Sequence, residues 1–274
     1  SRGLGDVYKR QAVLLNIIPK RYKELDLSEI DTYFAMARGY QGEHGDVKAL
    51  AMKKWFNTNY HYIVPETEDD TKIKLSGDKL WNEYAEADEI GIKTKPMLTG
   101  AYTMLKLCRY TGNKSEKDYV CDIIAAYKEL LQTCGKKQIA WVQFDEPSLV
   151  LDMDDSDKAL FHQIYDELLA VETDTKVLLQ TYFGDIRDIY EEVIKMPFAG
   201  IGLDFIEGKQ TCDLVSKYGF PKDKVLFAGV VNGKNIWKNH YDKTLKVLSG
   251  LREMGIDTVI STSVSYTHLR AHET

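Results

Sequence analysis

Acidic and amide side chains gather where predicted strands end along this 274-residue chain. Asp145 and Glu146 follow one apolar run, and Asp204 lies at the end of a second. Asn232 follows a third. Two carboxyl groups at one strand end could act as general acid and base, or orient a ligand amine. The structural alternative is that Glu146 with Pro147 ends the strand, while Asp145 hydrogen-bonds to the next loop.

A second concentration of polar side chains lies in the stretch from Trp55 to Pro65, which has the composition of a single β-strand. A strand that only fills a core rarely carries Asn59 and His61, because each buried polar group needs a hydrogen-bond partner. We therefore expect this stretch to form part of a binding site. No second His or Cys stands at metal-ligand spacing from His61, which favours a hydrogen-bonded core histidine over a metal ligand.

Lys53 and Lys54 directly precede this stretch. The sequence predicts a loop over residues 40–46 and a short helical turn over residues 47–53 that leads into the strand. The two ammonium groups would then complement the dipole at the end of a solvated helical turn. From the residues alone, this structural interpretation is favoured over a ligand site.

Composition excludes several classes of protein. The net charge is -6 and no long Lys/Arg cluster is present, which argues against nucleic-acid binding. A small anion held by a local group of lysines is compatible with this charge. The four cysteines form no C-x-x-C pair, which predicts buried thiols in a reducing compartment. No apolar run has the length of a membrane span and no signal pattern is seen, so the expected location is the cytoplasm.

Short apolar runs alternate with longer amphipathic segments from residue 94 onward. Such alternation predicts βαβ units and a parallel sheet. The predicted strands are residues 94–99, 140–144, 177–182, 200–205, 226–231 and 258–262. The predicted helices are residues 115–133, 156–171, 186–195, 209–218 and 241–254, with two earlier helices at about 28–37 and 78–90.

With the Trp55 stretch, the count is seven strands, which favours a TIM-type (β/α)₈ barrel that lacks one strand. No G-x-G-x-x-G follows any strand, so the usual mark of a dinucleotide-binding sheet is missing. Polar residues recur at the carboxyl ends of the strands, where a barrel builds its site. The loop Gly229 to Asn235 lacks the Gly-Lys-Ser/Thr order of a P-loop, and its glycines suit a tight turn.

The two ends of the chain differ from the rest. Residues 1–11 and residues 264–274 resemble translated sequencing-adapter sequence found on genes assembled from environmental DNA. We therefore expect one natural domain, an incomplete barrel over residues 12–263, with a non-native tail at each end.

Several motifs follow one another along the chain. The main one is Lys54-Trp-Phe-Asn-Thr-Asn-Tyr-His-Tyr-Ile-Val-Pro-Glu66, and the others are Lys95-Pro-Met-Leu-Thr-Gly100, Trp141-Val-Gln-Phe-Asp-Glu-Pro147, Thr181-Tyr-Phe-Gly-Asp185, Gly202-Leu-Asp-Phe205, Ala228-Gly-Val-Val-Asn-Gly-Lys-Asn-Ile-Trp237 and Ser261-Thr-Ser263. In this order they resemble the N-terminal domain of cobalamin-independent methionine synthase. The resemblance implies a protein of two face-to-face barrels that moves a methyl group from 5-methyltetrahydropteroyltriglutamate to homocysteine. It also implies a zinc ion in the second barrel, whose residues have no counterparts in this sequence.

One site residue follows from this resemblance: Lys54 is expected to bind the polyglutamate tail of the folate. The resemblance also implies that the first barrel strand is missing and that the fragment is inactive alone. Its partners would be the methylfolate and the missing second barrel, and no cofactor is expected in the fragment itself. A residue before a barrel strand should face away from the usual active site, which conflicts with a ligand role for Lys54. The alternative function is a self-sufficient barrel lyase or decarboxylase that uses Asp145, Glu146 and Asp204.

Overall fold

The computed structural model describes residues 10–235 and 237–262. The expected adapter-like tails fall outside these residues, apart from residues 10 and 11, so they stay predictions. Contacts along the chain define two compact units. The first contains the described residues up to Thr94 together with Met104–Leu130, and the second contains Lys95–Thr103 and the described residues from Leu131 onward.

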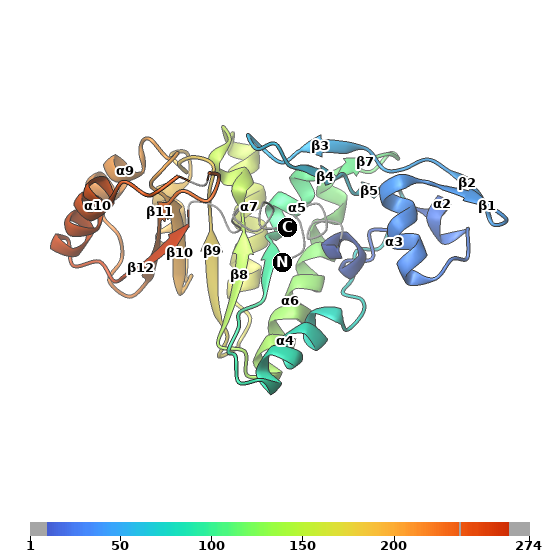
Figure 1. The fold of residues 1–274 in the computed structure, drawn as a ribbon, viewed down its shortest axis with the longest axis horizontal. Helices are drawn as coiled ribbons and strands as arrows, with labels where there is room; N and C mark the ends of the chain where they lie inside the picture. The colour runs from blue at the N-terminus through green and yellow to red at the C-terminus, as the bar shows by residue number, and fades with distance from the viewer. Residues whose placement is uncertain (1–9, 236, 263–274) are drawn as a thin grey trace. The chain divides into compact units, whose positions relative to one another are not determined.

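The second unit is built on a six-stranded parallel sheet with the strand order β12-β11-β10-β9-β8-β6 (Figure 1). Its strands are β6 (Met97–Thr99), β8 (Trp141–Asp145), β9 (Lys176–Gln180), β10 (Gly200–Asp204), β11 (Val225–Val231) and β12 (Thr258–Thr262). All six were predicted from apolar runs, a pattern typical of parallel strands that are covered by helices.

The helices of the second unit follow the strands in alternation. They are the 3₁₀ helix η2 (Pro147–Val150), α7 (Asp155–Leu169), α8 (Tyr190–Val193), α9 (Thr211–Tyr218) and α10 (Tyr241–Glu253). Asp154 begins α7 with a capping box, in which its side chain accepts the Asp157 N–H at 2.8 Å. The helix predicted over residues 186–195 is shorter, because only Tyr190–Val193 is α-helical there.

Two of the boundaries between the units fall within two further helices. α5 (Ala101–Leu107) was not predicted, because it begins one residue after β6 and leaves no polar break between strand and helix. The helix predicted over residues 115–133 is present as the 3₁₀ turn η1 (Glu116–Tyr119) followed by α6 (Val120–Lys136). No helix among the described residues is long and apolar enough to cross a membrane.

The order of the strands identifies the type of sheet. Neighbouring strands follow one another in chain order from β6 to β12, whereas the order in a doubly wound sheet reverses partway. This is the winding of a TIM-type barrel, and the predicted fold class is confirmed. Within the described residues the barrel is not closed, since the outer edges of β6 and β12 have no strand partner. Val259 and Ile260 of the edge strand β12 are exposed.

The first unit contains small sheets and helices. Its helices are α2 (Lys20–Lys23), α3 (Glu29–Arg38) and α4 (Lys79–Glu89), and residues 10–14 are also helical. Ser28 caps α3 by accepting the Asp31 N–H at 3.1 Å. The strands β1 (Tyr40–Gly42) and β2 (Gly45–Val47) form an antiparallel hairpin, and β5 (Glu66–Thr67) pairs in parallel with β7 (Arg109–Tyr110). Tyr22, Ala35, Met36, Leu50 and Ile63 form the core beneath these elements.

Three sequence-based predictions for this unit are wrong. The loop predicted over residues 40–46 is the β1–β2 hairpin. The helical turn predicted over residues 47–53 is instead the end of β2, a connection and the start of the next strand. The Trp55 stretch is not a barrel strand. It belongs to an antiparallel hairpin in which β3 (Met52–Lys54) pairs with β4 (His61–Ile63). The parallel sheet therefore has six strands rather than the seven expected.

Candidate functional site

The carboxyl ends of the strands in the second unit meet at one edge of the sheet. The register places Thr99 opposite Asp145 and Asp145 opposite Gln180. Further along, Asp204 pairs with Gly229, and Gly229 pairs with Ser261. The structure therefore places Asp145, Glu146, Asp204 and Asn232 on one rim, as predicted. Lys54, Asn59 and His61 belong to the first unit.

Asp145 takes part in a chain of polar contacts along one face of the sheet. Its carboxylate, 5% exposed, accepts hydrogen bonds from Gln143 Nε2 at 2.7 Å and from the Tyr182 hydroxyl at 3.2 Å. Lys95 Nζ donates to Gln143 Oε1. Loss of surrounding water lowers the pKa of Lys95, and the charge of Asp145 opposes this effect. Lys95 and Gln143 were not predicted as part of this group, although residues 141, 143 and 145 must share one face of a strand.

Glu146 has a structural role. Its side chain is fully buried and accepts three hydrogen bonds at the start of α5. Oε1 accepts the Tyr102 N–H at 3.0 Å and the Tyr165 hydroxyl at 2.5 Å, and Oε2 accepts the Thr103 N–H at 2.7 Å. These N–H groups have no partner within the helix, so Glu146 caps α5 from a distant strand end.

Two further observations define the Glu146 site. Burial raises the pKa of Glu146 to about 7, although all three donors favour the charged form. The carboxyl group occupies the space in which a side chain at position 100 would lie, because a Cβ on Gly100 would be 2.0 Å from Glu146 Oε1. The glycine between β6 and α5 is therefore required by this contact.

Asp204 organises two loops at the same rim. Oδ1 accepts the N–H groups of Ile206 at 2.8 Å and Glu207 at 2.9 Å, and Oδ2 accepts the Phe183 N–H at 2.9 Å. Phe183 has a left-handed backbone with φ 77°, which this contact helps to hold. Burial raises the pKa of Asp204 to about 6.

These contacts weaken the case for acid-base catalysis. Glu146 and Asp204 use their oxygen atoms to hold backbone N–H groups, and Asp145 is held by Gln143 and Tyr182. A catalytic pair needs a carboxyl group within hydrogen-bond reach of substrate. The geometry therefore favours the structural alternative for Glu146 and Asp204, and it does not favour the lyase or decarboxylase function.

Asn232 closes the loop after β11. Its Oδ1 accepts the Lys234 N–H at 2.9 Å, which forms a tight turn. Lys234 Nζ lies 2.6 Å from Glu207 Oε1 and 4.8 Å from the centre of the Phe183 ring. This turn therefore joins the loops that follow β9, β10 and β11.

In the first unit, the β3–β4 hairpin presents the other predicted site residues. Its turn is closed by Thr58, whose hydroxyl donates to Trp55 O at 2.6 Å and accepts the Tyr60 N–H at 3.2 Å. Trp55 and Tyr62 are buried and pack edge to face at 5.5 Å. These contacts lie within the hairpin and stabilise its turn and its strand pairing.

The remaining predicted site residues of the hairpin are exposed. Lys54, Asn59 and His61 are all exposed, so the prediction of a core histidine is wrong. Lys54 lies directly opposite His61 in the strand register, which brings the two basic side chains close together. Lys53 is the next residue along the strand and therefore points to the opposite face. The expected conflict over a residue before a barrel strand does not arise, because β3 is not part of the barrel sheet.

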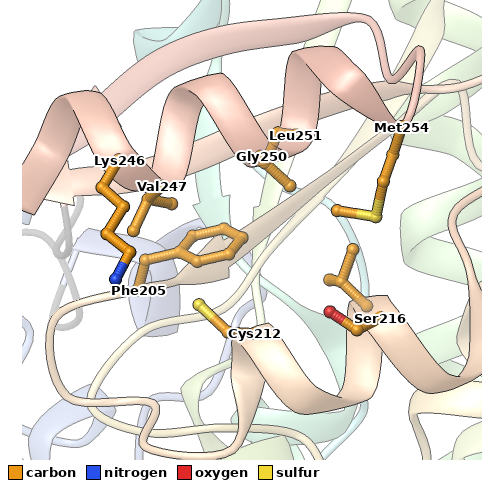
Figure 2. Close-up of a pocket in the computed structure, with 9 residues that line it drawn as sticks. Phe205, Cys212, Ser216, Lys246, Val247, Gly250, Leu251 and Met254 are labelled. Carbon is orange, nitrogen blue, oxygen red and sulfur yellow. The ribbon is translucent and has the colours of Figure 1, made fainter.

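Described residues of the second unit line at least two cavities. One, of about 220 Å³, lies between α9 and α10, with the Phe205 ring between Cys212 and Val247 (Figure 2). Another, of about 410 Å³, lies at the carboxyl ends of β10 and β11, and its lining includes Asn232. The described residues contain no group of three or more His, Cys, Asp or Glu side chains placed to hold a metal ion.

Comparison with known proteins identifies the family. A family model described as "Cobalamin-independent synthase, N-terminal domain" matches residues 6–255. The 5-methyltetrahydropteroyltriglutamate–homocysteine methyltransferase of Lactococcus lactis subsp. lactis is 52% identical over 258 residues, which are 94% of this chain and 34% of the relative. The enzyme of the same name from Campylobacter jejuni subsp. doylei is 50% identical, with the same coverage. This chain thus spans about a third of the length of the curated relatives it matches.

A solved structure agrees on the fold. The B12-independent methionine synthase from Shewanella sp. W3-18-1 aligns with a TM-score of 0.59 at 12% identity, covering 76% of this chain and 66% of that chain. Together with the strand order and the family match, this places the chain among the cobalamin-independent methionine synthases, as a member that corresponds to their N-terminal domain.

Proposed function

We propose that the protein to which this chain belongs transfers a methyl group from 5-methyltetrahydropteroyltriglutamate to homocysteine. The Lactococcus lactis relative, which is 52% identical, is named for this activity, and this supports the proposal. Because this chain corresponds to about a third of that relative, the reaction belongs to the whole protein rather than to these residues.

Within that reaction, the β3–β4 hairpin binds the glutamate tail of the folate through Lys54. The observation that carries this proposal is the exposure of Lys54 beside His61, on a hairpin stabilised by buried aromatic residues. A string of γ-linked carboxylates is a multiply charged ligand that an ammonium group can hold as a point charge. Asn59, exposed in the same hairpin, can add an amide donor.

The zinc ion that the family implies does not fit the residues described here. No group of three or more potential ligands is present in residues 10–235 and 237–262, so no step is assigned to zinc in this chain. A metal of this kind would activate the homocysteine thiol elsewhere in the whole protein.

The chain alone is expected to be catalytically inactive. Glu146 and Asp204 are committed to backbone N–H groups, so these two carboxyl groups are not available as a general acid and base. Incubation with methylfolate triglutamate, homocysteine and zinc should give no methionine above the rate without protein. Methionine formation by the purified chain would contradict this prediction.

Replacing Lys54 with alanine should weaken binding of γ-linked triglutamate by about five- to tenfold, the effect of one charge-assisted contact of about 1 kcal/mol. Binding would be measured by titration calorimetry at low salt, where surface charges are least screened. Lys53→Ala is the matched control, because it removes the same charge from the opposite face of β3. Its effect should stay below about twofold. An equal loss of affinity in both variants, or no loss in either, would show that Lys54 does not bind the glutamate tail.

A further inference from the structure

The larger cavity of the second unit has the features of a separate ligand site. It encloses about 410 Å³ at the carboxyl ends of β10 and β11, next to the start of α10. This volume is within the range typical of small-molecule sites. Its walls are formed by Phe205, Ile206, Val230, Asn232, Asn235, Trp237, Lys238, Asn239, His240, Lys243, Thr244 and Val247. We call it the basic rim cavity.

The charged side chains of the basic rim cavity are of one sign. Lys238 and Lys243 line it together with the imidazole of His240, and no Asp or Glu is among its described lining residues. The nearby carboxylate of Glu207 is paired with Lys234 at 2.6 Å, so its charge is largely balanced. In a protein with a net charge of -6, such a wall favours an anionic ligand.

Amide groups add neutral donors to this wall. Asn232 Oδ1 accepts the Lys234 N–H at 2.9 Å, and Asn235 Oδ1 accepts the Trp237 N–H at 3.0 Å. Each turn fixes the oxygen end of the amide, so the NH₂ group is the end that can donate to a ligand. The cavity thus combines ammonium, imidazole and amide donors.

The rest of the cavity is apolar. Ile206, Val230 and the exposed Trp237 indole provide surfaces for a nonpolar group. Phe205 and Val247 also line the 220 Å³ cavity between α9 and α10, so the two cavities are neighbours (Figure 2). The smaller cavity is lined mainly by apolar side chains, including Leu251 and Met254. An apolar part of a ligand can therefore extend toward α9.

We propose that the basic rim cavity binds a small organic phosphate, with the phosphate at Lys238, His240 and Lys243 and its apolar part against Trp237. A phosphate monoester carries a charge of about -1.5 to -2 at pH 7 and three acceptor oxygens, so two ammonium groups can contact it at once, whereas a carboxylate carries a single charge. Two lysines, Lys238 and Lys243, line the cavity. This site is independent of the folate-tail function of Lys54.

The four tryptophans of the chain give a direct test with phenyl phosphate as the probe. In ¹H–¹⁵N spectra, the indole signal of Trp237, assigned with Trp237→Phe, should shift saturably during a titration. The signals of Trp55, Trp81 and Trp141 should stay in place and confirm that each variant is folded. Lys243→Gln and Lys238→Gln should each raise the dissociation constant about tenfold, as expected for a lost charge-assisted contact. Benzoate should bind at least about tenfold more weakly than phenyl phosphate.

Lys246→Gln is the matched control, because Lys246 is one turn further along α10 and lines the smaller cavity. It should change the dissociation constant by less than about twofold. Lys54→Ala should leave phenyl phosphate binding unchanged, which keeps this test separate from that of the folate tail. The proposal is overturned if Trp237 shows no saturable shift, if benzoate binds as tightly, or if Lys246→Gln weakens binding as much as Lys243→Gln.

Discussion

Replacing Glu146 with alanine is expected to lower the free energy of unfolding by about 3 to 5 kcal/mol. The variant leaves the Tyr102 and Thr103 N–H groups and the Tyr165 hydroxyl without their acceptor, in a site from which water is excluded. It also opens a cavity beside Gly100. Chemical denaturation followed by circular dichroism measures the loss. A change below about 1 kcal/mol would show that Glu146 does not cap α5.

Glu146→Gln removes the negative charge of the side chain but keeps nearly the same shape. The amide keeps one oxygen acceptor but turns an NH₂ group toward the Tyr102 or Thr103 N–H, so its cost should be smaller, about 1 to 2 kcal/mol. It also removes a titrating group. In the folded state the pKa of Glu146 is raised to about 7, whereas a free glutamate has a pKa of about 4.3.

The raised pKa fixes the sign of the pH dependence. The folded state retains a proton that the unfolded state loses, so this contribution to stability is present in full below about pH 4.3. It is lost as the pH rises through about 7. The free energy of unfolding of the unmodified chain should therefore fall by about 3 to 4 kcal/mol over this range relative to Glu146→Gln. A gap between the two proteins that is independent of pH would contradict the assignment.

Asp204→Ala is expected to cost about 2 to 4 kcal/mol, because three backbone N–H groups lose a buried acceptor. One of them belongs to Phe183, whose left-handed backbone would then lose a supporting contact. Denaturant unfolding gives the value. Asp174→Ala is the control, since Asp174 is an exposed carboxylate of the same unit, so its change should stay within about 0.5 kcal/mol. Equal effects of the two substitutions would rule out this role for Asp204.

The barrel part of the fold was predictable because its signals are local and repeated. The strands β8, β9, β10 and β11 are short runs that are largely buried, and most of the helices between them carry clear polar boundaries. β12 also contains apolar residues, although Val259 and Ile260 are exposed. α5 was missed because only Gly100 separates it from β6. The helix can begin so soon after the strand because Glu146, a residue far along the chain, caps it. Such long-range capping leaves no mark in the local sequence.

A different reason explains why the β3–β4 hairpin was not predicted. Trp55 to Pro65 has aromatic and β-branched residues typical of a strand, and that composition concealed a turn. The signal that could have revealed the turn is Asn57-Thr58-Asn59, because these residue types favour turns by hydrogen-bonding to the backbone. Thr58 makes such bonds in the structure. The exposure of His61 follows from that turn and could not be deduced from a single-strand interpretation.

The positions of the candidate site residues were easier to predict than their roles, for a physical reason. Strand-end position correctly placed Asp145, Glu146 and Asp204 on one rim, but it could not distinguish a carboxyl group that faces a ligand from one that holds backbone N–H groups. Lys54 entered only through the resemblance to a family, because a lysine at the end of a strand has no distinguishing local pattern. Its exposed place opposite His61 now gives it a structural basis.

Carbodiimide cross-linking of γ-linked triglutamate to this chain tests the central claim most directly, because it joins a carboxylate only to an amine that it touches. After digestion, mass spectrometry identifies the modified lysine. Lys54 should carry most of the cross-link and Lys53 little. Excess free triglutamate should lower the amount of cross-linked product. Cross-links spread evenly over the exposed lysines, or centred on a lysine outside the β3–β4 hairpin, would contradict this claim.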